Sequence, residues 1–260
     1  MNLDLSGKNA IVCGGSQGIG KAAAIELSLL GANVTLIARD EQKLKSAWNE
    51  LHHGHQVHHY ISADFSNPAD VKKKIDEFVS KHTVHILVNN TGGPPAGQAI
   101  DANPEDFLKA FSNHLICNQI LAQAVVPGMK KEKYGRIINI ISTSVKVPLR
   151  GLGVSNTIRG AVANWSKTLS LELGPFGITV NNVLPGATMT ARLESIINTN
   201  AQKKGISVEE AKQDMIKEIP LGRISEPHEV AAAVAFLASP AAGYINGINI
   251  PVDGGRTGSL

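Results

Sequence analysis

The stretch NAIVCGGSQGIG, residues 9–20, decides the fold class. Its apolar, β-branched start predicts a strand over 9–13, and glycines at positions 14, 18 and 20 then interrupt the chain where a helical pattern over 19–30 begins. Such glycines let the chain turn tightly, so that backbone N–H groups and the positive end of the helix dipole can face a pyrophosphate. A plain strand–turn–helix corner is the alternative. The strand before, the helix after and the pattern that follows favour a dinucleotide site.

Short β-branched runs alternate with longer helical patterns along the rest of the chain. Strands are expected at 9–13, 33–38, 56–62, 85–89, 136–142, 178–184 and 247–252, and helices at 19–30, 68–80, 105–129, 153–173 and 226–238. The strands are apolar on both faces, as in a parallel sheet with helices on both sides. Strict alternation implies right-handed crossovers. We therefore expect an α/β protein: a single-domain Rossmann fold over residues 1–260, with a doubly wound seven-stranded parallel sheet and helices on both faces.

Two local features refine this scheme. The longest segment without a strand, residues 187–223, lies late in the chain, where an insertion beside the carboxyl edge of a sheet is usually a substrate lid. The sequence SEPHEV predicts a helix start with Ser225 as N-cap, Pro227 in the first turn and Glu229 close behind.

Composition excludes several other classes of protein. The formal net charge is only +3, aromatic residues make up 4%, and the basic residues are scattered among acidic ones, so no nucleic-acid partner is expected. Two cysteines are too few for a disulfide framework or a thiolate metal site. Five of the nine histidines lie between residues 52 and 59, but no carboxylate–cysteine set supports them, and we predict no metal site. With no signal region and no apolar run of membrane-spanning length, we expect a soluble, cytoplasmic protein that does not contact a membrane.

The end of the second expected strand, LIARDEQK, bears on the choice of cofactor. An acidic residue there would bond a ribose 2′-hydroxyl and select NAD, but Ala38 ends the strand and Arg39 follows. An arginine can pair with a 2′-phosphate, so NADP(H) is favoured over NAD(H). Asp40 is expected to be the N-cap of the next helix.

Several motifs resemble the short-chain dehydrogenase/reductase family. They are the spacing Gly14-x-x-x-Gly18-x-Gly20, NNTGG at 89–93, ADF at 63–65, NNVLPGATMT at 181–190 and the C-terminal section from 220. The likeness covers essentially the whole chain and is nearest to 3-oxoacyl-(acyl-carrier-protein) reductase-like members. It implies hydride transfer between a dinucleotide and a small carbonyl or alcohol substrate, and a homotetramer built through the two long helices and the last strand. The cofactor-binding residues it implies are Gly14, Ser16, Gly18, Ile19, Gly20, Arg39, Asp64, Asn90, Gly92, Arg159, Pro185, Gly186 and Thr190.

Four positions carry the chemistry in that family: an Asn, a Ser, a Tyr and a Lys four residues after the Tyr. Ser142 matches the serine, whereas Ser155 stands in the Tyr position and Arg159 in the Lys position. The resemblance puts His114 in the Asn position, although Asn113 would serve after a slip of one residue.

These substitutions change what the site can do. A serine hydroxyl is a much weaker acid than tyrosine, so Ser155 is a poor proton donor. Arg159 can hold the ribose, stabilise a developing oxyanion and pair with a carboxylate, which makes an anionic substrate plausible. His114 is the candidate acid because imidazole ordinarily titrates near neutrality, and a packing histidine is the alternative.

The chain contains other acids and nucleophiles. Tyr60, Tyr134 and Tyr244 could replace the missing tyrosine only from distant segments, and Cys117 is expected to be a core residue. Two hypotheses remain, an atypical NADP(H)-dependent oxidoreductase and a catalytically silent dinucleotide-binding protein. The enzyme is preferred because arginine keeps the cation of the replaced lysine.

Overall fold

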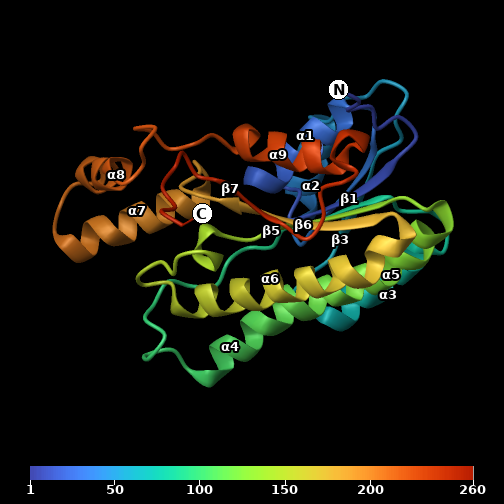
Figure 1. Cartoon of the computed structure of the whole chain (residues 1–260). Helices are drawn as coiled ribbons and strands as arrows, with labels where there is room; N and C mark the ends of the chain where they lie inside the picture. Colours follow the sequence, from blue (N-terminus) through green and yellow to red (C-terminus); the bar gives the residue numbers. More distant parts are fainter. Residues whose placement is uncertain (260) are drawn as a thin grey trace.

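Seven parallel strands form one sheet in the order β3-β2-β1-β4-β5-β6-β7 in the computed structural model, which describes residues 1–259 (Figure 1). The order reverses between β1 and β4, as in a doubly wound sheet. The predicted fold class is confirmed. The strands are β1 (Asn9–Cys13), β2 (Asn33–Ala38), β3 (His59–Ser62), β4 (Ile86–Asn89), β5 (Gly135–Ile140), β6 (Ile178–Pro185) and β7 (Asn249–Val252).

Helices cover both faces of the sheet (Figure 1). The helices α1 (Gly18–Leu29), α2 (Glu41–Asn49) and α9 (Pro227–Ala238) share an apolar cluster with one face, and α3 (Pro68–Val79), α5 (Cys117–Glu132) and α6 (Gly153–Leu173) pack on the other. α4 (Pro104–Phe111) precedes α5 and contacts α6. Within residues 1–259, no helix is both long and apolar enough to span a bilayer.

The expected helix over 105–129 is divided. A π-helical turn, Ser112–Ile116, separates α4 from α5, and α5 continues to Glu132 despite Pro127. Such turns contain one extra residue and are frequent at functional sites. Hydrophobic periodicity does not reveal them.

β5 ends at Ile140 and not at residue 142, and β7 begins at Asn249 and not at residue 247. Two further predicted boundaries are wrong because side chains bind the backbone there. β3 begins at His59 and not at residue 56. The Val57 N–H donates to the side chain of Asn33 (2.8 Å) and therefore cannot form a backbone hydrogen bond with the neighbouring strand β2. The N-cap of α9 is Glu226, which forms a capping box with Glu229, whereas the Ser225 hydroxyl donates to the Ala187 carbonyl (3.1 Å). The Asp40 cap of α2 is confirmed, since its side chain accepts from the Lys43 N–H.

The segment 187–223 contains two helices, α7 (Ala191–Lys204) and α8 (Val208–Lys217), which extend beyond one end of the sheet (Figure 1). They bury a small apolar cluster of their own, which includes Leu193, Ile197 and Ile219. That the segment 187–223 acts as a substrate lid stays a prediction.

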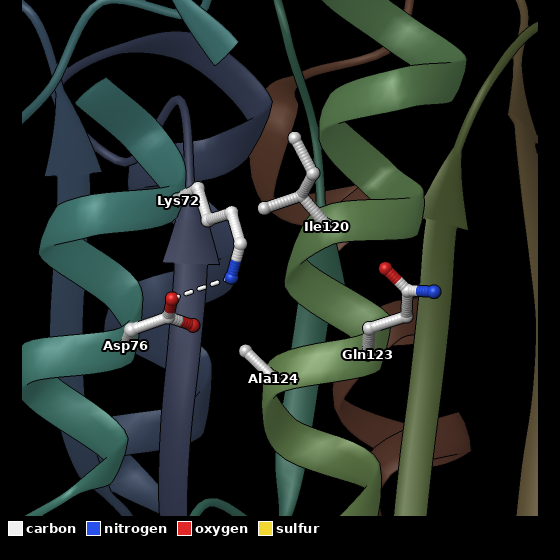
Figure 2. A pocket seen from close by; sticks show the side chains of 5 residues that line it. All are labelled: Lys72, Asp76, Ile120, Gln123 and Ala124. Carbon is white, nitrogen blue, oxygen red and sulfur yellow. Dashed lines mark hydrogen bonds and ion pairs between the residues drawn. The ribbon is translucent and has the colours of Figure 1, made fainter. Parts of the chain in front are cut away.

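A small hollow of about 100 Å³ lies between α3 and α5. Figure 2 shows Lys72 turned toward Asp76 at its wall, where the two form an ion pair of 2.6 Å, opposite Ile120, Gln123 and Ala124. None of the predicted site residues lines it. We assign it no function.

Histidines satisfy backbone donors where two strands begin. The Val34 N–H donates to Nδ1 of buried His58 and the Asn9 N–H to Nδ1 of buried His85, both at 3.0 Å. Burial lowers the pKa of both histidines below the usual value. Each accepts through an unprotonated nitrogen, so protonation there would end the bond.

We expect the protein to lose stability as the pH falls below about 6.5, the pKa of histidine in the unfolded chain. In that range the unfolded chain binds protons that the folded chain does not, which costs at most about 1.4 kcal/mol per pH unit for each histidine. Urea unfolding at pH 7.5 and 5.5 measures the loss. His58→Asn together with His85→Asn keeps an acceptor near each N–H and should make the dependence less steep, with buried His114 still contributing, while exposed His55→Asn should leave it unchanged. Equal pH dependence in both variants would contradict this account.

Candidate active site

The carboxyl ends of β1, β4, β5 and β6 bring the predicted site residues to one edge of the sheet. The glycine loop follows β1, Asn90 follows β4, Ser142 follows β5 by two residues, and Pro185 ends β6. In doubly wound sheets, ligands bind at this edge, where the strand order reverses.

The glycine loop forms a cradle that side chains would fill. Gly14 has φ +60°, and a Cβ there would lie 2.4 Å from the Asn90 carbonyl oxygen. A Cβ on Gly20 would lie 2.2 Å from the Gly14 carbonyl oxygen. Both contacts are far shorter than van der Waals distance, so these positions require glycine.

The N-terminus of α1 suits an anion. Its N-cap, Gln17, makes no side-chain cap bond within the described chain, and no acidic residue lies in the first turn. The first N–H groups of the helix are therefore not capped by a side chain, and the dipole adds positive potential. Ser16 and Ile19 flank this turn and are half-buried. The cradle and the helix end together fit a pyrophosphate.

Arg39 and Asp64 lie exposed where β2 and β3 end. The Asp64 carboxylate accepts the Ser66 N–H at 2.9 Å, and this contact with Ser66, aided by Arg39, holds the pKa of Asp64 below its usual value. Asp64 is thus ionised, an acceptor for hydroxyl or amino groups, and Arg39 is available to an anion.

The far side of the cradle comes from the chain after β6. The Gly186 N–H donates to the Val252 carbonyl (2.9 Å), and Thr190 caps α7 by accepting the Leu193 N–H (3.3 Å). The Thr190 methyl lies 3.3 Å from the position of a Cβ on Gly18. The segment that leads into α7 therefore faces the glycine loop directly. Gly92, by contrast, is exposed.

Ser155 and Arg159 lie one helical turn apart on the same face of α6, and both are buried. An Arg159 Nη atom donates to the Ile140 carbonyl at 3.2 Å, which ties α6 to the end of β5. Burial, with a smaller effect of Arg192, lowers the pKa of Arg159 to about 10, so it stays charged at neutral pH. No ion pair joins it to a carboxylate anywhere in residues 1–259. The Ser142 hydroxyl accepts the Ser144 N–H (3.1 Å).

His114 does not have the protonation expected of it. It lies in the π-helical turn, 2% exposed, with Nδ1 2.6 Å from the Thr91 hydroxyl oxygen. Burial, followed by the charges of Arg159 and Arg192, lowers the pKa of His114 to about 3. The expectation of an acid that titrates near neutrality is therefore wrong. His114 is a neutral hydrogen-bonding group.

The other candidates lie elsewhere. Asn113, with its amide oriented to satisfy both atoms, donates to the Phe65 and Lys109 carbonyls at 3.1 Å, so the one-residue slip has no support. The Tyr134 hydroxyl donates to the Ala238 carbonyl (2.8 Å) and Tyr244 is fully exposed. Burial raises the pKa of Cys117 to about 11, as expected of a core thiol. Tyr60 is half-buried in β3.

Two residues beside the predicted site, Arg192 and Thr91, were not predicted from the sequence. Arg192, in the first turn of α7, donates to the carbonyls of Gly93 (2.7 Å) and Pro94 (2.8 Å) and so fastens α7 to the loop after β4. No sequence motif predicts the contact between Arg192 and this loop. Thr91, the partner of His114, does have a signal in the sequence. It stands in NNTGG where the N-N-A-G pattern has alanine.

Comparisons with known proteins agree with this geometry. The model of a family described as Enoyl-(Acyl carrier protein) reductase matches residues 14–257. A 3-oxoacyl-(acyl-carrier-protein) reductase, FabG of Rickettsia felis, is 35% identical over 97% of this chain and 98% of its own. The NADPH-dependent reductase BacG of Bacillus subtilis is 30% identical over 98% of this chain and 100% of its own.

A solved structure has a closely similar fold. The L-sorbose reductase of Gluconobacter frateurii, complexed with NADPH and L-sorbose, superposes with a TM-score of 0.93 at 29% identity, with all of both chains covered. The family match spans nearly the whole chain. The chain belongs to the short-chain dehydrogenase/reductase family, and it is an oxidoreductase by its relatives.

Proposed function

We propose that the chain is an atypical NADP(H)-dependent oxidoreductase that acts on a small, negatively charged carbonyl or alcohol compound. The observation that carries this proposal is Arg159, a buried cation with no carboxylate partner among the described residues, on the helix beside a dinucleotide cradle. A buried charge without a partner is costly, and a substrate anion would supply one.

The residues present fit NADP(H). Gly14, Gly18 and Gly20 with the N-terminus of α1 would hold the pyrophosphate, Asp64 and Arg39 the adenosine end, and Asn90, Pro185 and Thr190 the nicotinamide side. The cofactor supplies a hydride at its nicotinamide ring. Ser16, Ile19, Gly92 and Gly186 complete the proposed lining. Support for NADP(H) comes from BacG, named as NADPH-dependent, and from the NADPH complex of the sorbose reductase.

Arg39→Ala is expected to remove the preference for a 2′-phosphate. Wild type should bind 2′,5′-ADP about 10- to 100-fold more tightly than 5′-ADP, because a charge-assisted pair with phosphate contributes about 1.5–3 kcal/mol. In the variant the two affinities should converge through weaker binding of 2′,5′-ADP alone. Calorimetry with both nucleotides measures this, and an unchanged ratio would mean that Arg39 does not contact the phosphate.

At the reacting end we assign Ser155 and Arg159 to the positions of the Tyr and Lys of the Tyr-x-x-x-Lys motif. Ser142 and Ser155 would orient the substrate oxygen, and Arg159 would hold the ribose and stabilise negative charge on that oxygen. His114, held neutral and bonded to Thr91, would contribute hydrogen bonds and no proton of its own.

Matched acids and methyl esters test the charge of the substrate. We expect NADPH oxidation, followed by absorbance, to be at least about tenfold more efficient with saturated or α,β-unsaturated 2-oxo acids than with their esters, because only the acids pair with Arg159. Arg159→Gln should remove most of the difference. Equal rates for acids and esters in wild type would sink the proposal of an anionic substrate.

Assembly and location are part of the proposal. Exposed apolar side chains on the long helices, Ile116 beside α5 and Leu171 on α6, support a homotetramer through these helices and β7, which light scattering would test. We keep the proposals of a cytoplasmic protein and of a single domain whose segment 187–223 covers the substrate.

A second candidate is a silent dinucleotide-binding protein, a cofactor sensor or an oligomeric partner. It is favoured by the neutral state of His114 and the lack of a tyrosine at Ser155. Tight NADPH binding without oxidation by any of the acids or esters would select it.

A further inference from the structure

Two arginines from different helices lie near the reacting end of the site. Arg159 belongs to α6, and Arg192 to the first turn of α7, which Thr190 caps. After burial, which has the larger effect, the charge of Arg192 lowers the pKa of Arg159, and both arginines lower the pKa of His114. Like charges act on one another in this way only when they are close together. The two cations and the neutral imidazole therefore border one space.

Neither arginine has a carboxylate partner. No ion pair within residues 1–259 includes Arg159 or Arg192. No carboxylate of the described chain is among the groups that shift the pKa of either arginine or of His114. Two positive charges are therefore uncompensated here, and a single substrate carboxylate would neutralise only one of them.

Arg192 is fixed in place with part of its guanidinium free. One Nη atom donates to the Gly93 carbonyl (2.7 Å) and the other to the Pro94 carbonyl (2.8 Å). A guanidinium has more N–H groups than these two bonds use, and the others make no hydrogen bond within the described chain, where Arg192 is exposed. The cation is thus oriented before a ligand arrives, which lowers the entropic cost of binding one.

The hydrogen bonds of Arg192 place it with the reacting end of the site. They join it to the loop after β4, which also carries Thr91, whose hydroxyl oxygen lies 2.6 Å from Nδ1 of His114. The anionic groups of the cofactor have other partners in the proposed function. The pyrophosphate lies at the glycine loop and the N-terminus of α1, and the 2′-phosphate at Arg39. Arg192 is therefore available to the substrate.

We propose that the substrate carries a second, distal carboxylate, which pairs with Arg192 while the carboxylate beside the carbonyl group pairs with Arg159. The inference rests on the proposed function, which supplies the carbonyl group and the first carboxylate. A planar carboxylate matches the free N–H groups of a guanidinium, and two carboxylates balance two arginines. The substrates are dicarboxylic 2-oxo acids or the corresponding hydroxy acids, and Arg192 is the residue that selects them.

Isosteric pairs of acids test the second carboxylate. In 5-methyl-2-oxohexanoate two methyl groups replace the distal carboxylate oxygens of 2-oxoglutarate, and 6-methyl-2-oxoheptanoate has the same relation to 2-oxoadipate. When NADPH oxidation is followed by absorbance, kcat/KM should be at least about tenfold higher for the diacid in at least one pair, the scale of one hydrogen bond to a charged group. Arg192→Gln should abolish this preference by slowing the diacid alone. Arg150→Gln, which changes an exposed arginine just before α6, should leave the preference unchanged.

Three results would overturn the inference and leave the proposed function intact. The first is equal efficiency within both pairs in wild type. The second is an equal loss with both members of a pair in Arg192→Gln, because Arg192 would then only hold α7 to the loop after β4. The third is weaker NADPH binding by Arg192→Gln with an unchanged preference for the diacid, which would assign Arg192 to the cofactor. Failure of wild type to bind NADPH would instead overturn the proposed function.

A binding measurement needs neither turnover nor cofactor. Glutarate has two carboxylates, and 5-methylhexanoate is its isostere with one. In calorimetric titrations of wild type, with and without NADP⁺, glutarate should bind at least about tenfold more tightly, and Arg192→Gln should remove the difference. Equal affinities in wild type would overturn the inference even if no 2-oxo acid oxidised NADPH.

Two alanine substitutions in the loop after β4 provide a matched comparison for the same titration. A Cβ on Gly93 would lie 2.7 Å from Cζ of Arg192, so Gly93→Ala should displace the guanidinium and reduce the preference for glutarate. Nothing lies within 4 Å of the Cβ position of Gly97, so Gly97→Ala should keep the preference. Melting temperature shows that each variant is folded. An equal preference in the two variants would contradict the assignment of the distal carboxylate to Arg192.

Discussion

Gly14→Ala is expected to weaken NADPH binding by at least about 100-fold while the protein remains folded. The residue has φ +60°, which costs an L-residue about 1–2 kcal/mol, and the new Cβ would lie 2.4 Å from the Asn90 carbonyl oxygen. Relief of that contact moves the loop away from β4 and takes its N–H groups out of line with a pyrophosphate. Calorimetry with NADPH measures the loss.

Gly7→Ala is the matched control. Gly7 also has a positive φ, +75°, but nothing lies within 4 Å of its Cβ position. It should pay the conformational cost in stability and keep its NADPH affinity. If Gly14→Ala bound NADPH as well as Gly7→Ala, the cradle would not be the binding site.

The double substitution Ser155→Tyr with Arg159→Lys is expected to increase the rate at which isolated carbonyl groups are reduced. The phenol would supply the missing acid, and a lysine one turn away would lower the phenol pKa. General acid catalysis contributes about 10²–10⁴-fold, so the rate with 2-oxo-4-phenylbutanoate should rise by at least about 100-fold. Steady-state kinetics with NADPH measures the gain.

Ser155→Phe with Arg159→Lys separates acidity from shape. It adds the same ring without the hydroxyl and should not raise the rate with 2-oxo-4-phenylbutanoate. A similar gain in both variants would show that packing of the ring, and not a proton donor, limits the natural protein. No gain in the tyrosine variant, with NADPH binding retained, would contradict the assignment of Ser155 and Arg159 to the two motif positions.

The sheet could be predicted from the sequence because its strands are buried on both faces. Continuous apolar runs such as NAIVC and NVTLIA match β1 and β2 residue for residue. The errors fall where side chains compete with backbone partners. Asn33 takes the N–H of Val57 from the expected start of β3, and Glu226 replaces Ser225 as a cap. The Asn33–Val57 contact and the bond from Ser225 to Ala187 join residues far apart in the chain, which a local pattern does not record.

The positions of the glycines could be predicted from the sequence, but the protonation and contacts of the site's side chains could be predicted only in part. Gly14, Gly18 and Gly20 are fixed by spacing, because the turn itself requires them. The protonation of His114 depends on burial and on two arginines that the fold brings close. The link from Arg192 to the loop after β4 joins residues about a hundred positions apart, which neither periodicity nor a motif records.

A calorimetric titration of the wild-type protein with NADPH tests the central claim, that the dinucleotide site is in use, most directly. It requires no knowledge of the substrate. The account predicts saturable binding of one NADPH per chain with a dissociation constant in the micromolar range. Absence of binding would contradict it, since the glycine loop would then only shape a turn between β1 and α1, and the proposed oxidoreductase would have no source of hydride.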